Sequence, residues 1–147
     1  HAILIVRGAG PVGYPGSAEV VNMLPPAALV RKGVTQLPTL GDGRQSGTSA
    51  SPSILNASPE SAVGGNLAII RSRDRIRIDL NDRRVDLLVS DEEIAARRAT
   101  MTIDVPPHQS PWQALYRTHT GQLETGGCLE FAVKYHDVCR DLPRHSH

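Results

Sequence analysis

Two short segments with strand character in the first 50 residues each lead into a glycine-rich loop. Residues 2–6 (AILIV) precede the loop GAGPVGYPG at 8–16, and residues 34–40 precede GDGRQSGTS at 41–49. Apolar, β-branched runs of this length predict buried strands, although Pro38 weakens the second. Glycine lets backbone amides approach a ligand closely. The pattern therefore predicts a strand-rich domain that presents two loops, each at the end of a strand.

Three further segments between residues 67 and 89 have β character. Leu67–Arg71, Arg75–Leu80 and Arg84–Val89 each predict a strand, with a hairpin turn at Asn81-Asp82. Proline and capping signals predict short helices over Ser17–Met23 and Ala27–Lys32, and one that starts at Ser58-Pro59 and is ended by Gly64-Gly65. A capping box at Ser90-Asp91-Glu92-Glu93 predicts a further helix that it opens, over Ile94–Arg98. Many strands, short helices and long glycine loops predict an α+β domain with a mixed, barrel-like sheet rather than a doubly wound fold.

The character of the chain changes at Asp104. Pro106-Pro107 indicates a linker, and two helical stretches follow, from Ser110-Pro111 to about Thr120 and from Leu129 to Cys139. We therefore expect a main unit over residues 1–103 and a helical C-terminal extension over 104–147 that packs on the same domain. The first residue is not Met and an apolar run begins at once, so we expect a domain excised from a longer polypeptide.

Composition excludes several classes of function. The 16 basic and 15 acidic side chains are nearly balanced, and aromatic residues make up 3%. These values argue against partners such as nucleic acid or an anionic membrane. No apolar stretch is long enough for a membrane span. Cys128 and Cys139 are too few for an iron–sulfur cluster, which usually takes four protein ligands. They fit ordinary thiols in a reducing compartment, so we expect a cytoplasmic protein.

The first loop matches the dinucleotide-binding pattern GxGxxG only by letter. Pro11 and Pro15 are incompatible with the helix start that this pattern needs, and no Gly-Lys-Ser/Thr follows for a P-loop. A surface turn is the simpler alternative. Glu19, just beyond the loop, is either a ligand for a hard cation such as Mg²⁺ or an acidic residue that favours a helix start.

The second loop contains more functional groups than the first. Asp42, Arg44, Ser46 and Thr48 place a carboxylate, a guanidinium and two hydroxyls between glycines. Backbone amides around such a serine can stabilise an oxyanion. The alternative is a polar turn in which Asp42 and Ser46 bond their own backbone.

These motifs resemble the dihydroxy-acid dehydratase and phosphogluconate dehydratase family. The matching segments are RGAGPVGYPGSAEV at 7–20, GDGRQSGT at 41–48, NASPESAVGGNLAII at 56–70 and RIRIDLNDRRVDLLVSDEEIAARR ending at 98. The later segment SPWQALYRTHTGQLETGGCLEFAVKY at 110–135 is similar to the tail of the branch that acts on sugar acids (aldonates). The resemblance implies a hydro-lyase that converts an aldonate to its 2-keto-3-deoxy acid.

The resemblance also implies a division of labour between two domains. Family members have an N-terminal domain that binds an iron–sulfur cluster and supplies most ligands of a Mg²⁺ ion. The C-terminal domain is a barrel-like, swivelling β/β/α unit, and only this second domain is represented here. We therefore expect its own N-terminal domain as a partner, a homo-oligomer, and no dehydration by the isolated fragment.

The resemblance assigns roles to individual residues. Ser46 is expected to be the catalytic base that removes the C2 proton, and Glu19 to be a Mg²⁺ ligand. Thr48 is expected to bind substrate or relay a proton. Asp42, Gly43, Arg44 and Gly47 are expected to support the second loop. His147 is a further candidate for substrate binding, with a disordered end or an expression scar as the alternatives.

Two other functions remain open from the sequence. One is dihydroxy-acid dehydration in branched-chain amino-acid synthesis. The other is a non-catalytic module that binds a small molecule, because the cluster cysteines are not on this chain. The lyase hypothesis predicts that Glu19 and Ser46 lie on one face of the domain.

Overall fold

The computed structural model describes residues 2–19, 25–44, 46 and 51–137. Three short strands form a parallel sheet in the order β1-β2-β3: Leu4–Val6, Thr39–Gly41 and Ser53–Ile54. A separate antiparallel hairpin consists of β4 (Ile76–Asp79) and β5 (Arg84–Leu87). Two sheets with short helices around them make this an α+β fold, as predicted. Within the described residues, no helix is both long and apolar enough to cross a bilayer.

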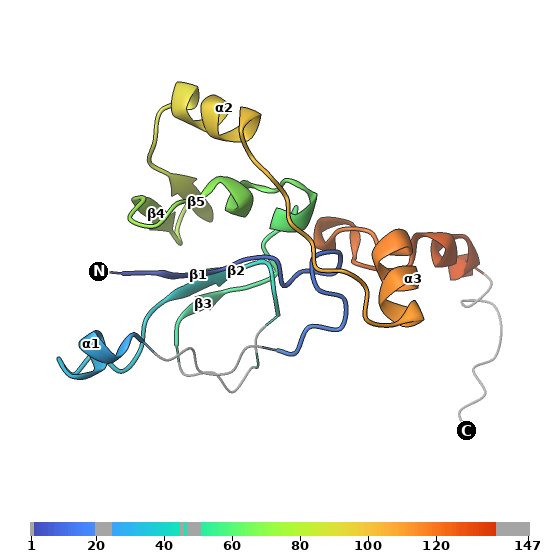
Figure 1. Ribbon diagram of the computed structural model, residues 1–147, viewed down its shortest axis with the longest axis horizontal. Helices are drawn as coiled ribbons and strands as arrows, with labels where there is room; N and C mark the ends of the chain where they lie inside the picture. The colour runs from blue at the N-terminus through green and yellow to red at the C-terminus, as the bar shows by residue number, and fades with distance from the viewer. Residues whose placement is uncertain (1, 20–24, 45, 47–50, 138–147) are drawn as a thin grey trace.

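Figure 1 shows the hairpin and helix α2 (Asp91–Ala99) on one side of the three-stranded sheet, and the C-terminal segment beside the ends of its strands. That segment contains α3 (Pro111–His119) and the 3₁₀ helices η3 (Leu123–Thr125) and η4 (Glu130–Tyr135). The short helix α1 (Ala27–Val30) lies between β1 and β2 in sequence. The fully enclosed apolar core is small, and the structure assigns to it Leu37, Leu40, Leu67 and Ile69.

The helices α2 and α3 begin where their sequences predict. Ser90 caps α2 by accepting a hydrogen bond from the Glu93 backbone N–H, and Ser110 caps α3 in the same way through Gln113. Such caps satisfy backbone donors that lack a partner in the first turn. Pro111 follows Ser110 at the first turn, where a missing N–H costs nothing.

The strand predicted over Leu67–Arg71 is wrong, because this segment contains the 3₁₀ helix η2 (Asn66–Ile69). Its carbonyls bond arginine side chains instead of a neighbouring strand. The Arg7 guanidinium donates to the carbonyls of Leu67, Ala68 and Ile70, and that of Arg97 donates to Ile69. A short apolar run cannot by itself distinguish a strand from a buried helical turn.

The helix predicted to start at Ser58-Pro59 also begins later. The 3₁₀ helix η1 covers Ser61–Val63, and Glu60 occupies its N-terminal cap position without a side-chain capping bond. The Glu60 side chain instead bonds residues distant in sequence. The helix predicted over Ser17–Met23 falls largely outside the described residues, and Ser17–Glu19 has no regular structure.

Candidate functional site

The first glycine loop is held by a carboxylate from the second. Asp42 follows β2 directly, and its two carboxylate oxygens accept from the backbone N–H groups of Gly8 and Ala9, both at 3.0 Å. The residue is fully buried. Ser61 completes the arrangement, because its N–H (2.9 Å) and its hydroxyl (2.5 Å) both donate to Asp42. Asp42 therefore bonds the first loop and η1.

A second buried carboxylate supports the same loop from another direction. Glu60 is fully buried, and its oxygens accept from the backbone N–H groups of Val12 at 2.9 Å and Gly13 at 2.8 Å. Nothing in the sequence marks Glu60 as a functional residue. Its partners lie 47 and 48 residues away, so no local pattern in the sequence reveals them.

The second loop meets the end of the first through Arg44. The Nε of Arg44 donates to the carbonyl of Ser17 at 3.4 Å. Gly43 is buried against Ala9, and a Cβ added to Gly43 would lie 2.9 Å from the Ala9 Cβ. Any larger residue at position 43 would therefore separate the two loops. The contact between the loops depends on this close approach.

The predicted catalytic and metal-binding side chains lie at the ends of these supported segments. Ser46 is half-buried two positions after Arg44, and Glu19 is exposed two positions after Ser17. The Arg44–Ser17 bond brings the segments that carry them together. Their convergence on one ligand stays a prediction. Gly47, Thr48 and His147 lie outside the described residues.

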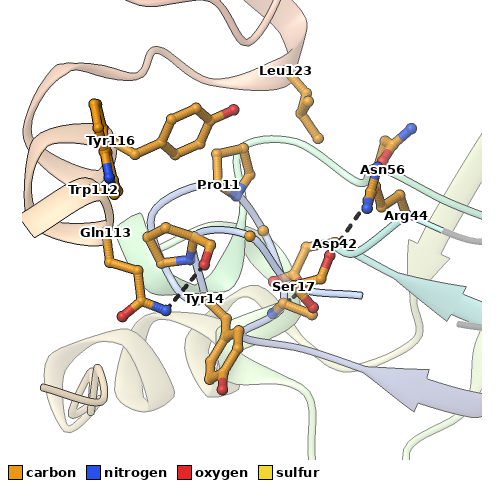
Figure 2. A pocket seen from close by; sticks show the side chains of 14 residues that line it. Pro11, Tyr14, Ser17, Asp42, Arg44, Asn56, Trp112, Gln113, Tyr116 and Leu123 are labelled. Atoms are coloured by element: carbon orange, nitrogen blue, oxygen red, sulfur yellow. Dashed lines mark hydrogen bonds between the residues drawn. The ribbon is translucent and has the colours of Figure 1, made fainter. Parts of the chain in front are cut away.

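A pocket of about 460 Å³ opens beside the two loops and is seen from close by in Figure 2. One wall comes from the two loops, with Tyr14 and Arg44, and from Asn56 after β3. The opposite wall comes from α3, with Trp112 and Tyr116. Its volume is in the range of small-molecule sites. Its lining is mainly apolar, from prolines, Leu123 and aromatic rings, and the Arg44 guanidinium and Asn56 amide supply polar groups that can bond an anionic ligand.

Comparison with known proteins decides the family. The family described as "Dihydroxy-acid/6-phosphogluconate dehydratase C-terminal" matches residues 1–127. The chain belongs to this family. The resemblance inferred from the loop motifs is therefore confirmed.

The relatives include several named sugar-acid dehydratases. The chain is 63% identical over its whole length to a protein of Caulobacter vibrioides named D-xylonate dehydratase, and it covers 25% of that protein. It is 39% identical over 89% of its length to an L-arabinonate dehydratase of Rhizobium leguminosarum bv. trifolii, of which it covers 23%. A dihydroxy-acid dehydratase of Clostridium beijerinckii is also 39% identical, over 87% of the chain and 23% of that relative. The chain thus spans about a quarter of the length of these relatives.

The described residues are better suited to share a magnesium site with another domain than to hold a Mg²⁺ ion alone. Among the residues that the structure describes, no group of three or more His, Cys, Asp or Glu side chains is placed to hold a metal ion. Mg²⁺ often takes only one or two carboxylates and completes its shell with water and substrate oxygens. Glu19 is exposed and can provide one of them.

An iron–sulfur cluster does not fit on this chain alone. The sequence contains two cysteines, and Cys128, the one that the structure describes, is an exposed free thiol. Cluster binding usually takes four cysteine ligands. Any cluster used by the complete enzyme would have to be held mainly by residues of another domain.

Proposed function

We propose that this chain is the C-terminal domain of a sugar-acid dehydratase, which removes water from an aldonate to give the 2-keto-3-deoxy acid. The observation that carries the proposal is the junction of the two glycine loops. Asp42 and the Arg44–Ser17 bond join them, with Ser46 near the end of one and Glu19 near the end of the other. The names of the relatives, D-xylonate and L-arabinonate dehydratase, support the substrate class.

In the proposed reaction, Ser46 takes the proton from C2 of the aldonate. A neutral serine hydroxyl is a weak base, so it must act as an alkoxide that backbone amides and a nearby cation stabilise. When bound, Mg²⁺ and the iron–sulfur cluster supply positive charge at the substrate carboxylate and at the leaving C3 hydroxyl. The electron pair of the C2–H bond forms the C2–C3 double bond as the C3–O bond breaks. The departing hydroxide takes up the proton held by Ser46, directly or through Thr48, and leaves as water, which restores the alkoxide. The enol then tautomerises to the ketone.

The other site residues have supporting roles in this proposal. Glu19 contributes one carboxylate to the magnesium ion. Thr48, two positions after Ser46, binds substrate or relays a proton, and His147 contacts substrate from the C-terminus. Asp42, Gly43, Arg44 and Gly47 keep the second loop in shape. The 460 Å³ pocket beside Arg44 gives the polyol chain of the aldonate a place to lie.

The proposal extends to the architecture of the whole enzyme. Residues 1–103 form a barrel-like, swivelling unit that closes over a site shared with an N-terminal domain, and residues 104–147 form an extension that packs on it. We propose a cytoplasmic homo-oligomer, and an isolated fragment without dehydratase activity.

The test is a substitution of the proposed base in the full-length enzyme. Ser46→Ala is expected to lower kcat with D-xylonate by at least about 100-fold, as expected when a general base is removed. Iron content and the melting temperature should stay close to those of the wild type. Ser72→Ala, at an exposed serine distant in sequence from the loops, is the matched control and should leave kcat unchanged. Activity that survives Ser46→Ala would place the base elsewhere.

A dihydroxy-acid dehydratase of branched-chain amino-acid synthesis is the second candidate, because a relative of that name is 39% identical. The two functions differ in the group at C4, which is a hydroxylated carbon in aldonates and an alkyl carbon in the branched-chain precursor. Comparing kcat/KM for D-xylonate and 2,3-dihydroxyisovalerate separates them. A higher value for dihydroxyisovalerate would favour the second candidate.

A further inference from the structure

Two adjacent residues of the first glycine loop have all their backbone polar groups bonded to charged side chains. The N–H groups of Val12 and Gly13 donate to the two oxygens of Glu60, at 2.9 and 2.8 Å. Their carbonyls accept from Arg117 of α3, from Nε at 2.7 Å and from Nη2 at 3.2 Å. The loop is therefore gripped between a carboxylate and a guanidinium that come from two different parts of the chain.

The Glu60 carboxylate is buried and is held by hydrogen bonds. Gln122, which follows α3, bonds Glu60 twice: its Nε2 donates to Oε1 at 2.8 Å, and its Oε1 accepts from the Glu60 backbone N–H at 2.8 Å. Gly10 leaves the space that the carboxylate fills, because a Cβ there would overlap Glu60. A buried charge is costly unless its oxygens are satisfied, so Glu60 depends on all three donors.

The Arg117 guanidinium is itself held by the segment that precedes α3. Its Nη1 donates to the carbonyl of Pro106 and to Nδ1 of His108, both at 2.9 Å. Arginine presents several donors in a rigid, planar fork, which a lysine cannot reproduce. Arg117 thus ties the C-terminal extension to the loop through two loop carbonyls, while two acceptors within the extension hold its guanidinium.

Further hydrogen bonds hold the loop backbone in the direction of Glu19. Tyr14 donates its N–H to the carbonyl of Gly10 at 3.0 Å, and Ser17 donates to that of Tyr14 at 2.9 Å. Gln113 of α3 donates to the carbonyl of Pro15 at 3.3 Å, as Figure 2 shows. With the Arg44 bond to Ser17, the backbone is held to within two residues of Glu19.

We propose that Glu60, Arg117 and Gln122 are positioning residues, which fix the first glycine loop so that Glu19 is presented to the magnesium ion. This inference rests on the proposed function, because it takes Glu19 to be a metal ligand. The C-terminal extension then supports the metal site through Arg117 and Gln122. We call these two residues and Glu60 the brace. Loss of the brace weakens Mg²⁺ binding through Glu19, without removing any ligand.

The experiment measures Mg²⁺ affinity by titration calorimetry in the full-length enzyme, together with the melting temperature. Arg117→Lys and Gln122→Ala are each expected to weaken Mg²⁺ binding about tenfold, as removal of groups that orient metal ligands commonly does. Arg31→Ala, at an exposed arginine, is the matched control and should leave the affinity unchanged. Glu60→Gln tests the carboxylate itself if the variant folds. Wild-type affinity in both Arg117→Lys and Gln122→Ala would overturn the inference.

A double-mutant cycle separates this inference from the proposed function. If the brace acts through Glu19, Arg117→Lys has no further effect on Mg²⁺ affinity in a Glu19→Gln background, since coupled residues are not additive. An equal loss in both backgrounds would show that Arg117 acts by another route and would overturn the brace. If Glu19→Gln alone left Mg²⁺ affinity unchanged, the metal-ligand role of Glu19 in the proposed function would fail, and the brace with it.

Discussion

At the scale of single residues, Asp42 carries the junction of the two loops. Its carboxylate accepts four hydrogen bonds from the first loop and Ser61 without any exposure to water. Asp42→Asn replaces one acceptor oxygen by a donor and leaves buried N–H groups unsatisfied. Because each such group costs about 1–3 kcal/mol, we expect a loss of about 3 kcal/mol in the free energy of unfolding. Urea unfolding followed by circular dichroism measures it.

The matched control for this prediction is Asp82→Asn. Asp82 is exposed in the turn between β4 and β5, where only its backbone N–H is bonded, to the side chain of Asp79. This variant should unfold within about 0.5 kcal/mol of the wild type, as surface substitutions usually do. An equal, small effect of both substitutions would contradict the structural role assigned to Asp42.

Single residues also show where sequence reasoning stops. The resemblance implied that Asp42 and Arg44 support the second loop. In the structure Asp42 bonds the first loop, and Arg44 bonds Ser17 just after it. Glu60, Arg117 and Gln122 were missed, because their bonds to the loop or to one another span 47 to 105 residues. The absence of side chains at Gly10 and Gly13 hints at close packing there. One sequence does not reveal which side chain fills the space.

At the scale of elements, helix α2 is attached to the rest of the molecule by a nearly buried ion pair. Arg97 donates to both oxygens of Asp74, at 2.6 and 3.1 Å, and also to Glu93. Hydrogen bonds from Arg97, and then from the Arg71 backbone, hold the pKa of Asp74 below its ordinary value of 3.8. The contribution of this ion pair to the free energy of unfolding is therefore fully present above pH 3.8. It is lost as the pH falls through the lower pKa that Asp74 has in the folded state.

This pKa shift gives a pH-dependent prediction. The wild type should lose free energy of unfolding as the pH falls below 3.8, and Asp74→Asn should lose less over the same range. At pH 7 the variant should be the less stable of the two, because the ion pair is absent. Urea unfolding at a series of pH values tests both statements. If the free energies of unfolding of the two proteins changed with pH in parallel, the pH-dependent contribution of Asp74 to stability would be contradicted.

Elements with a local signal were predictable from the sequence. The alternation in residues 75–80 predicted β4, and the serines before α2 and α3 predicted where these helices begin. The strand expected at residues 67–71 is wrong for a reason that lies outside the segment. Arg7 and Arg97 bind its carbonyls from distant positions, which stabilises a 3₁₀ turn in place of a strand.

At the scale of the whole molecule, the C-terminal segment is packed against the first glycine loop. Gln113 and Arg117 of α3 bond loop carbonyls, and Gln122 bonds Glu60. The family match, which runs to residue 127, likewise includes α3. The sequence predicted a helical extension on the same domain but not which surface it covers. The boundary at residue 103 stays a prediction.

In the proposed enzyme, Glu19 and Ser46 meet at one substrate-bound magnesium ion. The most direct measurement is a crystal structure of the full-length Ser46→Ala variant with Mg²⁺ and D-xylonate bound. We predict a Glu19 oxygen about 2.1 Å from the Mg²⁺ ion. We also predict C2 of the aldonate about 3 to 3.5 Å from the place that the Ser46 hydroxyl would occupy. Glu19 and position 46 on opposite faces of the domain, or the aldonate bound away from both, would contradict the account.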